Sequence, residues 1–366
     1  MLKRVSWTSW TTVVPVLALV ALVLTLGMEA GPVLAAVEAA FLIGAVLAAV
    51  HHAEVVAHRV GEPFGSLVLA AAVTVIEVAL ILALMASGGN ETATLARDTA
   101  FAAVMITMNG IAGLSLLLGS RRYGVTLFNA EGSGAALATL TTLATLSLVL
   151  PTFTTSHGGP EFSPGQLIFA AVASLGLYLL FVFTQTVRHR DFFLPVAQTG
   201  QKGLFEDESH AEPPSTGKAL RSLGLLLVAL VAVVGLAEQE SPAIEHLVSA
   251  AGFPDSFVGV VIASLVLLPE TLAAARTARL GRIQTSLNLA YGSSLACIGL
   301  TIPAIALAEI WLKGPLLLGL GATQMVLFAL TVVISVLTVV PGRATRLQGE
   351  VHLVLLAAYL FLAIIP

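Results

Sequence analysis

Two glutamates stand alone in long apolar stretches of the chain. Glu77 lies in LVLAAAVTVIEVALILALM, and Glu270 interrupts GVVIASLVLLPETLAAA. An ionisable side chain at membrane depth costs about 3 kcal/mol on insertion scales, so it is expected to face a cavity or a partner. Because neither stretch contains a Lys or Arg, the natural counter-charge is a cation or a proton. The two acids therefore predict one shared site that binds cations and protons.

Polar groups beside the acids are candidates to complete that site. Calcium takes about six to eight oxygen ligands, which is more than two carboxylates supply. Thr74 lies three residues before Glu77 and so on the same helical face. Ser264 precedes Glu270, and Pro269 lacks the amide hydrogen that would bond the carbonyl four residues earlier. We expect all three to support the site; hydroxyl bonding to the helix backbone and a simple kink are the alternative interpretations.

The apolar stretches after each acid carry amide residues. Asn109 lies in MNGIAGLSLLLG and Asn288 in LNLAYGSSLACIG, and an amide within a span needs a partner. Both are therefore supporting candidates, whereas close helix packing explains the neighbouring glycines and serines. Glu38 has no mate in this pattern, so it lines an external vestibule or marks a misplaced span boundary.

The composition predicts that these residues lie in a membrane protein. Of 366 residues, 57% are hydrophobic and 10% charged, which is too little charge for a soluble surface of this size. Uninterrupted apolar runs lack the alternation of barrel strands, so the expected fold is an all-α polytopic membrane protein. About 11 transmembrane helices are expected, at 12–28, 32–50, 65–86, 98–118, 134–150, 165–187, 220–236, 257–275, 284–310, 315–340 and 350–365.

The distribution of basic residues predicts the orientation. With the N-terminus in the cytoplasm, fifteen of the 17 Lys and Arg residues fall in cytoplasmic segments, and only Arg97 and Lys313 lie outside. We expect a multi-pass protein of the cytoplasmic (inner) membrane. The net charge of −4 gives no reason to expect nucleic acid, and the single Cys297 excludes an intramolecular disulfide.

The chain is expected to consist of two related halves. We assign 1–31 to a first span, 32–187 to repeat 1 (spans 2–6), 188–219 to an acidic cytoplasmic linker and 220–366 to repeat 2 (spans 7–11). The acid lies on the second helix of each half, and because five is odd the halves enter the membrane from opposite sides. This 5+5 arrangement after one extra N-terminal span is the inverted repeat of many secondary transporters.

With these residues in view, the chain resembles the calcium/cation-proton antiporters of the cation/calcium exchanger superfamily, most closely the bacterial sodium/potassium/calcium-proton type. The segments HRVGEPFGSLVLAAAVTVIEVALILALM and GFPDSFVGVVIASLVLLPETLAAARTA look like the two motifs of that family. The resemblance implies export of Ca²⁺, and also of Na⁺ or K⁺, in exchange for protons at Glu77 and Glu270. It implies no cofactor. The sequence departs from the family motif before each acid, because VTVI and VLLP stand where many members have Gly-Asn. The alternative is therefore a Na⁺ or K⁺/proton antiporter with little Ca²⁺ activity.

Two other classes compete with this interpretation. An intramembrane serine hydrolase would use Ser293 or Ser294 with His352 as base, but it leaves both buried acids unexplained. A passive channel would conduct cations without proton coupling. The sequence leaves open the ion preference, the stoichiometry, the oligomeric state, a homo-oligomer included, and any regulation by the acidic linker or by His51, His52 and His58.

Overall fold

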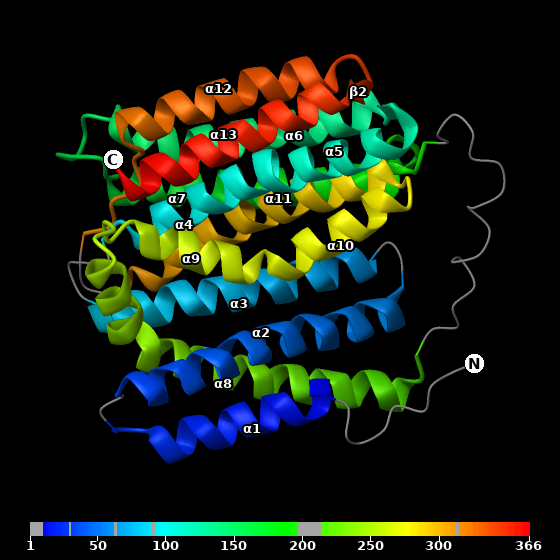
Figure 1. Cartoon of the computed structure of the whole chain (residues 1–366). Coiled ribbons are helices and arrows are strands. Elements are labelled where there is room, and N and C mark those ends of the chain that lie inside the picture. Colours follow the sequence, from blue (N-terminus) through cyan, green and yellow to red (C-terminus); the bar gives the residue numbers. More distant parts are fainter. Residues whose placement is uncertain (1–9, 29–30, 62–63, 89–92, 197–213, 312–314) are drawn as a thin grey trace.

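The structure is a computed structural model and consists almost entirely of helices (Figure 1). It describes residues 10–28, 31–61, 64–88, 93–196, 214–311 and 315–366. The helices are α1 (Trp10–Thr25), α2 (Pro32–Val60), α3 (Phe64–Gly88), α4 (Leu95–Met105), η2 (Ile106–Ile111), α5 (Ala112–Tyr123), α6 (Ala130–Ala144), η3 (Thr145–Val149), η4 (Leu150–Thr152), α7 (Pro164–Phe183), η5 (Thr184–Arg188), η6 (Arg190–Phe193), α8 (Thr216–Ala250), α9 (Phe257–Val266), α10 (Leu268–Arg279), α11 (Ile283–Ala308), α12 (Ala322–Val339) and α13 (Arg346–Ile364).

The predicted all-α membrane fold is confirmed at the level of its helices. Within the described part of the chain, eight helices are long and apolar enough to cross a membrane, and a ninth if the bent pair α9 and α10 forms one span. The first helix, α1, and the described apolar part of α3, Ala72–Met85, are shorter apolar helices. Every one of the eleven predicted places holds a helix, while the count of eleven crossings stays a prediction.

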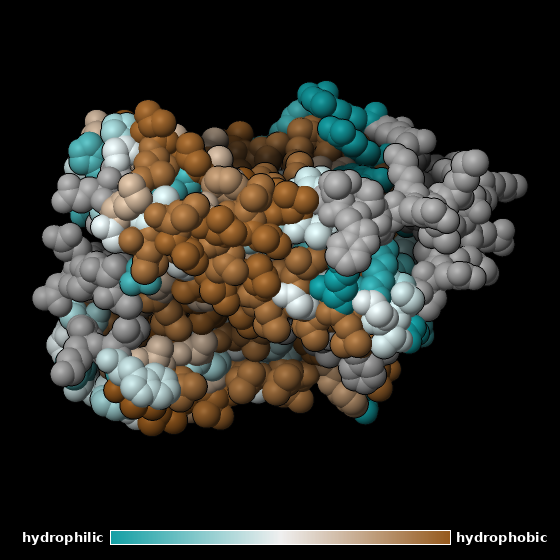
Figure 2. Space-filling view, turned by 90° about the horizontal axis from the view of Figure 1, so that it is seen from below, coloured by the Kyte–Doolittle hydropathy of each residue, from teal (hydrophilic) through white to brown (hydrophobic). Residues whose placement is uncertain are grey.

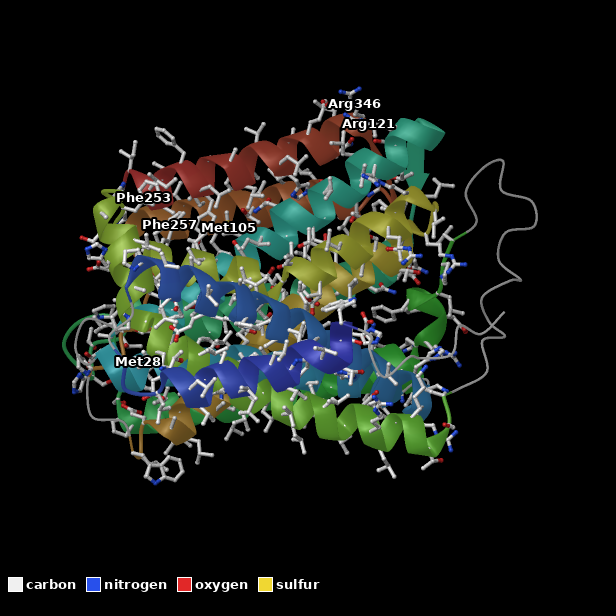
Figure 3. All side chains as sticks on the ribbon, turned by 60° about the horizontal axis from the view of Figure 1, so that its bottom comes forward. Met28, Met105, Arg121, Phe253, Phe257 and Arg346 are labelled. Carbon is white, nitrogen blue, oxygen red and sulfur yellow. The ribbon has the colours of Figure 1, made fainter. Side chains whose placement is uncertain are left out.

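The long helices run between two chemically different ends of the molecule. Figure 3 places Arg121 and Arg346 at one end, which we call the arginine-rich end, and Met28, Phe253 and Phe257 at the opposite end. A broad apolar belt lies between more polar ends in the space-filling view (Figure 2). This distribution suits a molecule whose middle lies in hydrocarbon.

A small sheet ties the two halves of the chain together at the arginine-rich end. Strand β1 (Val125–Leu127) pairs antiparallel with β2 (Arg343–Thr345), with Val125 opposite Thr345. The strands lie in the loops after α5 and after α12, so two connections far apart in sequence hold each other.

The ends of the predicted 188–219 linker have regular structure. A short 3-10 helix, η6, buries Phe193, and α8 already begins at Thr216. The acidic cluster Glu206, Asp207 and Glu208 lies outside the described residues.

The buried apolar residues divide into two cores. One is built mainly from α1, α2, α3, α8 and α9; the other surrounds α11 and takes residues from α4 to α7 and α10 to α13. Helices α3 and α9 contribute to both, for example through Ile76 and Ile262 to the first core and Ile81 and Ala263 to the second. The helices that carry or precede the two acids therefore lie on the boundary between two packed bodies.

Candidate functional site

The Glu270 carboxyl lies at a helix start in the middle of the apolar part of the molecule. Helices α9 and α10 meet at Leu267 with a bend of 53°, and Pro269 and Glu270 are the second and third residues of α10. The first amides of a helix have no partner within it and carry partial positive charge, which favours an anion there. The Glu270 carboxylate accepts a hydrogen bond from its own backbone N–H. The break thus places the amide end of a helix beside a buried carboxyl group.

The Glu77 carboxyl is held by a thiol from the second half of the chain. The side chain of Glu77 is 4% exposed, and Cys297 of α11 donates a hydrogen bond to its Oε1 at a sulfur–oxygen distance of 2.7 Å. Glu270 is 7% exposed, and its Oε2 has no hydrogen-bond partner among the described residues. The carboxyl groups of Glu77 and Glu270 interact electrostatically with each other.

Hydroxyl groups near the pair come from α3 and α11. Thr74 is 3% exposed, one turn before Glu77. Ser294 is fully buried one turn before Cys297 on the same face of α11, and its Oγ has no hydrogen-bond partner among the described residues. Since a buried hydroxyl without a partner is costly, Ser294 is a candidate oxygen ligand beside the acids.

The supporting residues predicted on the second motif lie in different surroundings. Ser264 is exposed on α9, and Pro269 is half-buried at the start of α10. Thr271 donates its hydroxyl hydrogen bond to the carbonyl of Leu267, at 2.7 Å. On this motif, the break before α10 shapes the surroundings of Glu270.

The predicted Asn109 lies in η2, a π-helical turn at mid-depth between α4 and α5. Its amide nitrogen donates to Thr331 Oγ1 at 3.0 Å, and its Oδ1 lies 3.0 Å from His352 Nδ1. The other ring nitrogen of His352 lies 3.2 Å from Thr338 Oγ1. Asn109 therefore joins α12 and α13 in a buried polar network, and a π-helical turn of this kind is frequent at functional sites.

The predicted Asn288 lies close to the arginine-rich end, in the second turn of α11. It donates to the carbonyl of Phe193 at 2.6 Å and accepts from Gln284 at 2.8 Å. These contacts anchor the linker end of the first half on the second half. Cys297, and not Asn288, has the same position along its helix as Asn109. Asn109 lies 14 residues after Leu95, where α4 begins, and Cys297 lies 14 residues after Ile283, where α11 begins.

The hydrolase alternative is contradicted by the surroundings of His352. Both ring nitrogens face Asn109 and Thr338, whereas Ser294 lies on α11 without a base. Nucleophile and base must be within hydrogen-bond reach of each other, so this geometry does not support a serine nucleophile.

Neither acid forms an ion pair within the described part of the chain. No group of three or more His, Cys, Asp or Glu side chains gathers there into a metal cage. A cation between Glu77 and Glu270 would thus take its remaining oxygen ligands from hydroxyls, backbone carbonyls and water. Such a loosely completed shell suits an ion that enters and leaves.

Known proteins with the same pattern provide an independent comparison. The family model described as "Sodium/calcium exchanger protein" matches residues 30–187 and 221–365. The y4hA protein of Sinorhizobium fredii (strain NBRC 101917 / NGR234) is 45% identical over 342 residues, covering 92% of this chain and 90% of that protein. The sodium-potassium/proton antiporter ChaA of Escherichia coli (strain K12) is 36% identical, covering 94% and 93% of the two chains.

Solved structures share the fold. That of native YfkE matches with a TM-score of 0.73 at 16% identity and covers 97% of this chain and 100% of its own. That of the H⁺/Ca²⁺ exchanger CAX matches with a TM-score of 0.71 at 15% identity, covering 96% of this chain and 86% of its own.

Proposed function

The chain belongs to the sodium/calcium exchanger protein family, and from this premise we propose that it is a secondary antiporter that moves inorganic cations out of the cytoplasm in exchange for protons. It is an ion antiporter and not an enzyme. The observation that carries the proposal is the pair of Glu77 and Glu270, two buried carboxyls that interact with each other and form no ion pair within the described part of the chain.

This acid pair explains how cation movement is coupled to proton movement without nucleotide hydrolysis. A cation and protons compete for the same carboxylates, so each excludes the other. An empty pair with two negative charges is costly to enclose, because neither charge is then compensated in the apolar interior. Only the cation-filled and proton-filled pair should therefore cross between the two membrane sides, which makes the exchange obligatory.

The proposed substrates are first Na⁺ and K⁺, and second Ca²⁺. Na⁺ and K⁺ are the cations in the name of the relative that is 36% identical over nearly the whole chain. Two carboxylates also suit a divalent ion, and a 24% identical relative from Aphanothece halophytica is named a Ca²⁺/H⁺ antiporter.

The proposal includes the orientation and the repeat. We place the arginine-rich end in the cytoplasm and the protein in the cytoplasmic membrane, by the excess of basic residues in cytoplasmic loops. We assign α2 to α7 and α8 to α13 to the two inverted repeats. The position of α3 and α9 between two apolar cores supports a rocking motion of one body against the other.

Purified protein in proteoliposomes with a trapped pH dye tests this function. After a pH gradient is imposed, Na⁺, K⁺, Ca²⁺ and Mg²⁺ are added separately, and the expected result is dissipation of the gradient by Na⁺, K⁺ and Ca²⁺. Glu77→Gln and Glu270→Gln should each abolish the exchange, because an amide carries neither the negative charge that a cation needs nor a proton that can be released.

Matched controls make the result specific. Glu350→Gln removes an exposed acid that pairs with Arg346 on the surface of α13, and it should transport normally. Cation movement that leaves the internal pH unchanged under every gradient would replace antiport by a passive channel. Normal exchange by either central variant would remove that glutamate from the site.

A further inference from the structure

A second pair of buried carboxyl groups lies away from Glu77 and Glu270. Glu38 is near the start of α2, and Glu240 lies in the last third of α8; both are toward the end of the molecule opposite the arginine-rich end. Their side chains are 1% and 2% exposed. The packing of α2 on α8 brings the two carboxyls into a hydrogen bond with each other.

The hydrogen bonds of this pair leave two acceptor atoms unused. Glu38 Oε2 and Glu240 Oε1 have no hydrogen-bond partner among the described residues. A bond between two carboxyl groups requires a proton on one of them, because ionised carboxylates are acceptors only. The pair therefore holds at least one proton, with an unused oxygen on each side.

The helices around the pair provide no counter-charge for it. Helices α1, α2, α3 and α9 pack near α8, and the described residues of α1 and α9 include no titratable side chain. On α3 the titratable group is Glu77 at the middle, and on this half of α8 they are Glu238, Glu245 and His246. Gln239, beside Glu240, donates to the carbonyl of Thr25 on α1. The other titratable groups of α2 and α8 lie toward the arginine-rich end, among them Arg59, which donates to Thr216 at the start of α8.

We propose that Glu38 and Glu240 form a second cation-binding site, in which a small inorganic cation from the outer side displaces the shared proton and is coordinated by both carboxylates. The step balances: the O–H bond of the protonated carboxyl breaks, water of the outer solution accepts the proton, and the cation binds to the two carboxylates. The proposal rests on the proposed function for its ions and for its orientation. It places this site between the central acids and the outer surface.

The position of the pair supports a role in ion movement over simple helix packing. A neutral amide pair would join α2 to α8 with fewer unused atoms and no buried charge. Helices α2 and α8 are also the first helices of the two proposed repeats, and they pack directly on each other. An acid pair near the outer surface would gather cations leaving the central site or protons entering it.

Direct binding to a transport-deficient variant tests the site. The purified Glu77→Gln/Glu270→Gln variant is titrated with radioactive Na⁺ and, separately, with radioactive Ca²⁺ at mildly alkaline pH, with proton release measured in parallel. The expected result is saturable binding of at least one of these ions, with proton release. Adding Glu240→Gln should weaken that binding at least about tenfold, because the charge of the ligands sets cation affinity.

The Glu240→Gln substitution and its Glu238→Gln control make the same chemical change on the same helix. The glutamine amide at position 240 can still donate to the Glu38 carboxylate, so the contact between α2 and α8 is kept. Glu238→Gln removes an exposed acid two residues away on the same helix and should leave the binding unchanged. Gel-filtration profiles of all variants establish that they fold alike, and Glu38→Gln provides a second substitution of the pair if Glu240→Gln fails to fold.

The outcomes separate this site from the proposed function. Absence of saturable binding in the transport-deficient variant, or binding that persists unchanged after Glu38→Gln and Glu240→Gln, overturns the second site. Absence of exchange by the unaltered chain overturns the proposed function, and the binding measurement does not depend on it. Equal weakening of binding by Glu238→Gln would show that only the surface charge matters and would also overturn the site.

Discussion

The thiol of Cys297 donates a hydrogen bond to Oε1 of Glu77, so the central acid of the first half of the chain is held by a residue of the second half. The contact joins α3 to α11 across the boundary of the two apolar cores. A thiol is a weak donor, and its bond favours the ionised carboxylate that a cation needs. The bond therefore connects the proposed ion-binding carboxylate of Glu77 to the relative position of two helices.

Cys297→Ala is expected to weaken cation binding, because it removes the donor to Glu77. A bond of this kind contributes about 1 kcal/mol, so the apparent cation affinity should fall about fivefold. Cys297→Ser keeps a hydroxyl donor and should remain close to the unaltered protein. Cation-dependent dissipation of a pH gradient in proteoliposomes measures both affinities, and equal affinities for the alanine and serine variants would contradict a role of this bond.

The apparent cation affinity is expected to rise with pH. At low pH protons occupy Glu77 and Glu270, and the cation must displace them; at high pH the carboxylates are already free. In the range where the pair titrates, each displaced proton changes the binding free energy by about 1.4 kcal/mol per pH unit. Cation titrations from mildly acidic to alkaline pH give this slope, and a flat profile would rule out shared carboxylates even if transport occurred.

Pro269→Ala is expected to slow exchange without loosening the fold. Alanine restores an amide that can bond the carbonyl of Leu265, and it removes the ring that disfavours a continuous helix by about 3 kcal/mol. The 53° break should then straighten and move Glu270 away from the helix start. We expect a lower rate of exchange at an equal or higher unfolding temperature. A straightened variant that exchanges at the normal rate would show that the break is dispensable.

Gly259→Ala is expected to destabilise the protein. A Cβ on Gly259 would lie 2.7 Å from the backbone nitrogen of Thr99, so α9 and α4 would have to separate. Overpacking of this kind costs about 1–3 kcal/mol. Gly292→Ala is the control: nothing lies within 4 Å of its Cβ, and alanine favours the helix by about 1 kcal/mol. Unfolding temperatures in detergent compare the two, and equal values would contradict the close approach.

The sequence by itself determined the membrane class and marked two acids that are buried in the structure. Apolar stretches of span length require helices, since lipid cannot satisfy a bare backbone, and a lone acid such as Glu77 or Glu270 stands out against them. The helices occur at all the predicted places for this reason. Local signals also marked Pro269, and the break lies beside it.

Only the tertiary structure decided which residues meet these acids. Cys297 and Glu77 are 220 residues apart, and no local pattern specifies that α11 packs on α3. Asn288 looked equivalent to Asn109 by sequence, but it lies nearer its helix start and binds the carbonyl of Phe193. A span prediction follows apolar composition alone, whereas the partners of a polar side chain depend on packing between distant segments.

The pair of Glu38 and Glu240 shows most clearly that sequence patterns do not predict contacts between distant segments. The apolar signal of the seventh span ends at about residue 236, where AEQES begins, so Glu240 reads as part of a loop. In the structure α8 continues to Ala250, because α1 and α2 pack along it and bury residues beyond the apolar run. Helix packing, which composition does not encode, therefore turned two unrelated acids into a buried pair.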